Sequence, residues 1–198
     1  READNVFYTL AGPEISVATT KAYSAQLIAA YTLALQFAKE RNEIEMPEYE
    51  KLIKELDTLP DKIQEVIDNQ EEIQKFAAKQ AAAKDVFFIG RGIDYAVSLE
   101  GSLKLKEISY IHSEAYAAGE LKHGTISLIE DGTLVIGVLT QDELYEKTIS
   151  NMLECKSRGA YLMGMTTYGN YEIEDQVNFA VYVPKVDEHF MASLAVIP

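Results

Sequence analysis

Short apolar runs alternate with helical stretches in the second half of the chain, and this alternation favours a parallel β-sheet covered by helices. Apolar runs of about four to eight residues are typical of strands that are buried on both faces. The strands that we predict are Val86–Ile89, Leu134–Leu139, Ala160–Met165, Phe179–Val183 and a shorter one near Glu114–Ala117. The helices that we predict lie at Asp94–Ile111, at Glu143–Arg158 and after Asp187. The sequence therefore predicts an α/β fold with a mainly parallel five-stranded sheet.

The first 84 residues differ in character from this α/β part. We predict a strand at Asn5–Leu10 that leads into a Gly12-Pro13 turn, and then an apolar-rich helix from about Val17 to Arg41. From Pro47 to Lys84 the pattern is helical and charged, and Pro60 is expected to restart a helix there. We divide the chain into the end of a first domain (1–45), a helical connector (46–84) and a second domain (85–198) that we expect to be truncated at its C-terminus.

Composition excludes several classes of function. The formal net charge of -14 argues against nucleic acid as a partner, because phosphates demand a basic surface. No apolar run approaches the length that spans a membrane, and the polar first residues do not resemble a signal peptide. Cys155 is the single cysteine, so no disulfide forms within the chain and a reducing cytoplasm is expected.

Three charged residues share one side of the helix predicted at Asp94–Ile111. Glu100, Lys104 and Glu107 form a stripe roughly 60° wide at about 100° per residue. Apolar residues flank the stripe, and a polar face that includes Ser98 and Ser102 lies opposite. We expect the stripe to lie within the buried apolar face, where burial perturbs ionisation. The alternative is a pair of ordinary solvated ion pairs.

The segment after this helix, from Glu107 to Gly124, mixes acids, bases and small residues without a clean period. Such a run suits an active-site loop better than a core. His123 lies in it between Lys122 and Gly124. A lone histidine is more often a surface or core residue than a catalytic one, and we assign His112 and His189 to that class.

Residues 99–124, from Leu99-Glu-Gly-Ser-Leu-Lys-Leu-Lys-Glu to Gly-Glu-Leu-Lys-His-Gly124, resemble the second sugar-isomerase (SIS) domain of the glucosamine-6-phosphate synthase family, also called glutamine–fructose-6-phosphate aminotransferases. A second stretch, Ala11-Gly-Pro-Glu-Ile-Ser-Val-Ala-Thr-Thr-Lys-Ala-Tyr23, resembles the end of the family's first SIS domain. With the segments between and after these two matches, the resemblance covers essentially the whole chain. It implies a three-layer αβα SIS domain.

The resemblance also implies a reaction and its residues. Glu107 matches the base that moves a proton between C1 and C2 of the sugar, Lys104 the lysine that assists it, and Glu100 the acid that positions this lysine. His123 matches a histidine that assists ring opening in the neighbouring subunit, which implies a homodimer. Val17 and Thr19 match sugar-binding positions, although the family more often has Gly at position 16 and Ser at position 19. The implied substrates are fructose 6-phosphate and glucosamine 6-phosphate, with no metal and no cofactor.

The family's N-terminal glutaminase, its phosphate-binding loop and its tail lysine have no counterpart in the sequence, so we expect this chain to be an inactive fragment of the isomerase region. Gly90-Arg91-Gly92 lacks the full glycine pattern of a nucleotide-binding loop, and we interpret it as a tight turn. Two alternatives remain open. One is another double-SIS enzyme, such as a fructosamine-phosphate deglycase, and the other is a non-catalytic module that senses sugar phosphates.

Overall fold

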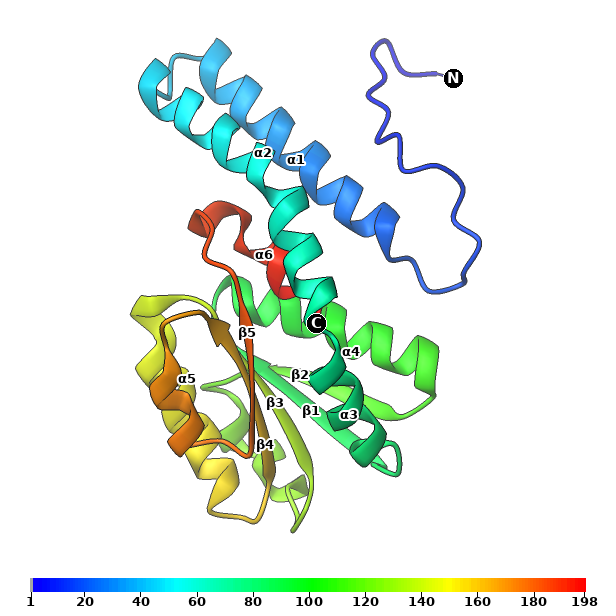
Figure 1. The fold of residues 1–198 in the computed structure, drawn as a ribbon, viewed down its shortest axis with the longest axis vertical. Coiled ribbons are helices and arrows are strands. Elements are labelled where there is room, and N and C mark those ends of the chain that lie inside the picture. The colour runs from blue at the N-terminus through cyan, green and yellow to red at the C-terminus, as the bar shows by residue number, and fades with distance from the viewer. Residues whose placement is uncertain (1) are drawn as a thin grey trace. The chain divides into compact units, whose positions relative to one another are not determined.

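The structure is a computed structural model that describes residues 2–198, and the chain divides into two compact units. The first unit ends at Thr58, and the second runs from Leu59 to Pro198. The second unit contains the sheet and every strand of the described chain (Figure 1). Our division of the chain at residues 45 and 84 remains a prediction.

The first unit begins without regular structure. Residues 2–20 form no helix or strand, so the strand predicted at Asn5–Leu10 is wrong. The apolar side chains of this segment are exposed. A strand needs a neighbouring strand for its backbone hydrogen bonds, and the described residues of the first unit form none. Helix α1 spans Lys21–Glu40 and starts four residues later than predicted. The Glu14 side chain accepts a hydrogen bond from the backbone N–H of Ala22 at 3.3 Å and so supports its first turn.

Helix α2 spans Met46–Asp68 and contains Pro60 in its interior. The prediction that Pro60 restarts a helix is therefore wrong. Proline removes one backbone hydrogen bond at a cost of about 3 kcal/mol, but Leu59 and Val66 on either side of it are buried, and their packing holds the helix together. The break comes later, where the Asn69 side chain donates to the Glu65 carbonyl at 2.9 Å, and helix α3 follows at Glu71–Gln80.

Five parallel strands form one sheet in the order β2-β1-β3-β4-β5. This confirms the predicted parallel sheet. The strands are β1 (Asp85–Gly90), β2 (His112–Ala117), β3 (Leu134–Leu139), β4 (Tyr161–Thr167) and β5 (Phe179–Val183). The strand order reverses between β1 and β3, and in open α/β sheets ligands bind beside such a reversal, at the carboxyl ends of the strands.

Helices cover both faces of this sheet, as Figure 1 shows. Helix α4 (Ile93–Ser109) packs on one face, where Gly101 lies against Phe88 of β1. The short helix α6 (Met191–Ala195) contacts α4, and Phe76 of α3 stacks on Phe179 at 4.5 Å. Helix α5 (Asp142–Lys156) packs on the opposite face, where Met152 contacts Gly137 of β3. The predicted three-layer αβα architecture is confirmed.

Short 3-10 helices lie in the connections between the longer elements. They are η1 (Leu121–His123), η2 (Thr125–Leu128), η3 (Tyr171–Asp175) and η4 (Glu188–Phe190). η4 and α6 together form the helical segment that was predicted after Asp187.

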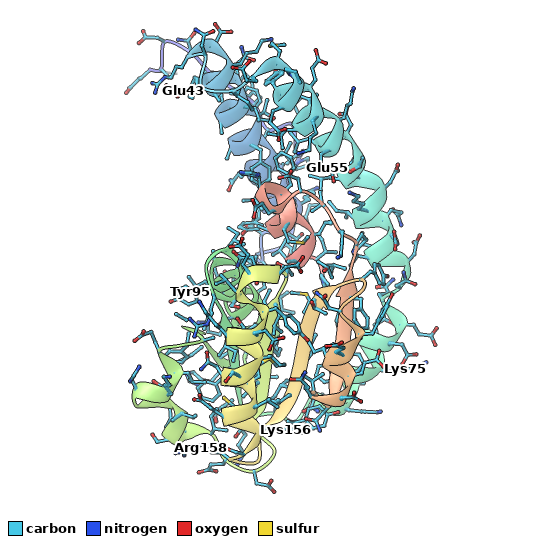
Figure 2. The ribbon with its side chains drawn as sticks, turned by 90° about the vertical axis from the view of Figure 1, so that its left-hand side faces the viewer. Glu43, Glu55, Lys75, Tyr95, Lys156 and Arg158 are labelled. Carbon is cyan, nitrogen blue, oxygen red and sulfur yellow. The ribbon has the colours of Figure 1, made fainter. Side chains whose placement is uncertain are left out.

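The main core lies between the sheet and α5. Phe87, Val135 and Leu162 from three neighbouring strands pack there against Met152 and Cys155 of α5. Figure 2 shows α5 lying along this face, with Lys156 and Arg158 labelled at its C-terminal end. Burial raises the pKa of the Cys155 thiol to about 11, so this cysteine is a packed thiol with little nucleophilic character, in line with its sequence-based interpretation.

Candidate functional site

Helix α4 carries Glu100, Lys104 and Glu107, which we call the charged triad. The side of α4 that packs on the sheet differs from the side predicted from the sequence. Ser98 and Ser102 are fully buried, whereas three of the apolar residues that flank the triad are 42–64% exposed, and Val97, on the same flank as Ile108, is buried. These exposed residues are Leu99, Leu103 and Ile108. The prediction that the apolar face is buried and the serine face solvated is therefore wrong.

Small side chains explain this orientation of α4. A Cβ atom added at Gly101 would lie 3.0 Å from the ring of Phe88, so the backbone of α4 lies very close to β1. The buried serine hydroxyls are satisfied within the protein. Ser98 Oγ donates to the Asp94 carbonyl at 2.8 Å, and Ser102 Oγ shares a hydrogen bond of 3.1 Å with Ser113 Oγ of β2. Small, hydrogen-bonded polar residues thus form the contact face, because larger ones would not fit.

The charged triad is assembled as the helical spacing predicts. Lys104 Nζ lies 2.6 Å from Glu107 Oε2 and 3.5 Å from Glu100 Oε1. The side chains of Glu100, Lys104 and Glu107 are 16%, 18% and 31% exposed, so they are neither fully buried nor ordinary solvated ion pairs. Glu107 is the most accessible member of the three. A molecule that approaches α4 from solvent therefore reaches the Glu107 carboxylate most easily.

The electrostatics of the triad fix the charge of its central member. The hydrogen bond to Glu107 raises the pKa of the Lys104 ammonium above its ordinary value, burial opposes this, and the charge of Glu100 adds to the rise. Lys104 is therefore a cation at neutral pH. It has the character of a hydrogen-bond donor that stabilises negative charge, and the base of the triad must be a carboxylate.

His123 does not join the triad within one chain. It is exposed in η1, which follows the carboxyl end of β2, whereas Glu107 lies near the end of α4, just before β2 begins. The six residues of β2 span about 20 Å. A reaction that needs both residues at one sugar therefore needs them from different copies of the chain or after a large rearrangement.

Val17 and Thr19, the two predicted sugar-binding residues, belong to the first unit, and the triad belongs to the second. Val17 is 96% exposed and Thr19 is half-buried, in the segment before α1 that has no regular structure. Thr20 is the N-cap residue of α1 and makes no side-chain capping hydrogen bond. The capping role that the sequence also allowed for these threonines is thus not filled by Thr20.

One polar residue that the sequence reasoning missed is Asp94, at the second position of α4. It is only 1% exposed, and its carboxylate accepts hydrogen bonds from the backbone N–H and the hydroxyl of Thr140, which follows β3. A sequence signal for it existed, since an acid in the first turn of a predicted helix follows the Gly90-Arg91-Gly92 turn. A Cβ atom at Gly90 would lie 2.5 Å from the backbone of Asp94, so this turn is as tight as predicted.

A cavity of about 430 Å³ lies at the carboxyl ends of β3, β4 and β5. Three carboxylates and one ammonium line it, from Asp142, Glu143, Glu188 and Lys185. This excess of negative charge does not suit a sugar phosphate.

Within residues 2–198 no cluster of three or more His, Cys, Asp or Glu side chains is arranged to hold a metal ion. None of the helices in this range combines the length and the hydrophobicity of a membrane-spanning segment.

The sequence profile of the SIS domain matches residues 81–198. Two similar curated relatives are the glutamine–fructose-6-phosphate aminotransferases (isomerizing) of Caldanaerobacter subterraneus subsp. tengcongensis and Clostridium tetani, each 54% identical over all 198 residues. The chain spans about a third of the length of these relatives, 33% in both cases.

A solved structure extends this similarity to the fold. The C-terminal domain of glucosamine-fructose-6-phosphate aminotransferase from Francisella tularensis is 34% identical to the chain, with a TM-score of 0.92. The match covers 100% of the chain and 56% of that domain structure. The similarity therefore includes both units of the chain and the helix that carries the triad.

Proposed function

The chain belongs to the SIS domain family, and from this membership we propose that it is part of the isomerase region of a glutamine–fructose-6-phosphate aminotransferase. The observation that carries the proposal is the charged triad on α4. Carboxylates held beside a largely shielded ammonium are suited to taking up and returning a proton, whereas a module that only senses sugar phosphates needs phosphate donors instead. The two named relatives, which match the whole chain, support the same reading.

In the proposed reaction, ammonia condenses with the C2 carbonyl of fructose 6-phosphate and releases its oxygen as water, and a proton then moves from C1 to C2 so that the carbonyl group forms at C1. Glu107 removes the proton next to the carbonyl and returns it to the adjacent carbon. Lys104 donates a hydrogen bond to the oxygen that becomes negative, and Glu100 holds Lys104 in place through their 3.5 Å ion pair. His123 of a neighbouring subunit assists ring opening, and Val17 and Thr19 contact the sugar.

We infer a homodimer in the cytoplasm, a sugar phosphate as substrate and product, and a glutaminase domain elsewhere in the complete polypeptide that supplies ammonia. We expect the 198 residues alone to be inactive, because the family's phosphate-binding loop and tail lysine have no counterpart in them. No metal or other cofactor is part of the proposed chemistry.

The test uses the complete polypeptide that contains this chain. Purified enzyme is incubated with fructose 6-phosphate and glutamine, and glucosamine 6-phosphate is quantified by mass spectrometry. A parallel reaction offers a fructosamine phosphate without glutamine. Formation of glucosamine 6-phosphate only in the first reaction supports the proposal. Turnover of the fructosamine phosphate alone would assign the chain to a deglycase, and turnover of neither compound would contradict a catalytic role.

A further inference from the structure

Helix α4 has few large apolar side chains with which to grip the sheet. Its contact face consists of Ser98, Gly101 and Ser102, and Val97 is the one buried apolar side chain of α4 among the described residues. A helix held by small residues buries little apolar surface, and its position along and around its own axis is then poorly fixed by packing alone. Directional hydrogen bonds must supply this precision.

Besides the Ser102–Ser113 hydrogen bonds in the middle of α4, a group of such bonds lies at its start. Asp94 Oδ2 accepts from the Thr140 N–H at 2.9 Å and from the Gln141 N–H at 3.4 Å, and Asp94 Oδ1 accepts from the Thr140 hydroxyl. In the reverse direction, Gln141 Nε2 donates to the Arg91 carbonyl at 2.6 Å. These four bonds, which we call the Asp94 network, join the turn before α4 to the segment between β3 and α5.

The charged triad depends on this anchoring, because it lies on the outer side of the same helix. Glu100 follows Asp94 by about 9 Å along the helix axis and Glu107 by about 20 Å. Over that length a small tilt or rotation at the first turn moves the Glu107 carboxylate by about 1 Å or more, and misplacement of a catalytic group by 1 Å can cost about a hundredfold in rate.

We propose that Asp94 is a positioning residue for the isomerisation, which sets the placement of Glu107 by fixing the first turn of α4 to Thr140 and Gln141. The inference rests on the function proposed above. Asp94 does not touch the sugar in this account, since it is buried beneath the first turn of the helix. It acts through the helix that carries the triad.

The experiment compares variants of the complete enzyme. Asp94→Asn keeps the shape of the side chain but replaces one acceptor oxygen with a donor. Thr140→Val removes the hydroxyl, whereas Thr140→Ser retains it, so these two form a matched pair. Asp61→Asn, an exposed substitution on α2, is the control for charge removal. Each variant is measured for kcat per folded site, for the KM of fructose 6-phosphate and for hydrogen exchange along α4.

We expect Asp94→Asn to lower kcat by about 10- to 100-fold and Thr140→Val by several fold, with KM changed less than about twofold. Thr140→Ser, which retains the hydroxyl, should have a kcat within about twofold of wild type. A merely structural role would lower the amount of folded enzyme but leave kcat per folded site unchanged. If Asp94→Asn does not fold, the Thr140 pair still decides the question.

Two results would overturn the inference. One is a folded Asp94→Asn enzyme with a kcat within twofold of wild type, and the other is an equal loss in the two Thr140 variants. Hydrogen exchange separates this failure from failure of the proposed function. Faster exchange of α4 amides through Glu107 in Asp94→Asn supports the anchoring of the helix by Asp94 even if the wild-type enzyme makes no glucosamine 6-phosphate, and unchanged exchange contradicts the inference.

Discussion

The orientation of α4 is tested by placing a large apolar residue on its serine face. The sequence alone predicts that Ser102→Leu is harmless, because it assigns Ser102 to a solvated polar face. The structure predicts a loss of stability, since Ser102 is 2% exposed and packs beside Ser113 of β2. Ile108→Ser is the matched control on the opposite side, where Ile108 is 64% exposed.

The magnitude follows from the contacts of Ser102. Forcing extra methyl groups into a packed site costs about 1–3 kcal/mol. Loss of the hydrogen bond between the Ser102 and Ser113 hydroxyls adds about 1 kcal/mol. The sum of about 2–4 kcal/mol corresponds to a fall of roughly 4–16 °C in the midpoint of thermal unfolding for a chain of this size. Ile108→Ser should cost less than about 1 kcal/mol, because most of that side chain already faces solvent.

The assay is unfolding of each variant by urea and by heat, followed by circular dichroism. Equal midpoints for Ser102→Leu and wild type would refute the orientation of α4 described here. So would a larger loss in Ile108→Ser than in Ser102→Leu.

Three further predictions concern other sites. Burial raises the pKa of Asp94, so the contribution of this carboxyl group to the free energy of unfolding is complete below its unfolded pKa and is lost as pH rises through the folded pKa. In urea titrations, the free energy of unfolding of wild type relative to Asp94→Asn should therefore fall from about pH 4 upward, and a rise would contradict this. Gly137→Ala should lower the free energy of unfolding by about 1–3 kcal/mol, because the new Cβ would overlap the Met152 sulfur. An unchanged midpoint of thermal unfolding would contradict tight packing at this position. In the complete enzyme, mixed dimers of His123→Ala and Glu107→Gln subunits should regain partial activity, because each then contains one intact shared site; no recovery after verified subunit exchange would count against sharing.

Most of the sheet could be predicted from the sequence, because parallel strands buried on both faces are continuous apolar runs. Leu134–Leu139 and Phe179–Val183 agree with β3 and β5 to the residue. The strand predicted at Asn5–Leu10 failed for the opposite reason, since local composition says nothing about whether a partner strand exists. Pro60 failed because the packing of its neighbours outweighs the local preference of proline.

The candidate site was predictable where its geometry is local. Glu100, Lys104 and Glu107 meet because they are three and four residues apart on one helix. The face that α4 buries was not predictable from hydrophobicity, because steric closeness at Gly101 decides it. Asp94 was missed because its partner Thr140 lies 46 residues away, and such pairing is visible only in the folded chain.

The central claim is that Glu107 transfers the proton, and the Glu107→Gln variant of the complete enzyme tests it most directly. Glutamine keeps the shape of the side chain and its place beside Lys104 but cannot act as a base. Glu114→Gln, on β2, is the control. The measurement is the steady-state rate of isomerisation together with the affinity for fructose 6-phosphate. The account predicts that Glu107→Gln lowers the rate by about 10² to 10⁴ fold with binding retained, and that Glu114→Gln costs far less. A Glu107→Gln rate within a few fold of wild type, or loss of sugar-phosphate binding itself, would contradict the account and leave Glu107 as a structural ion-pair residue.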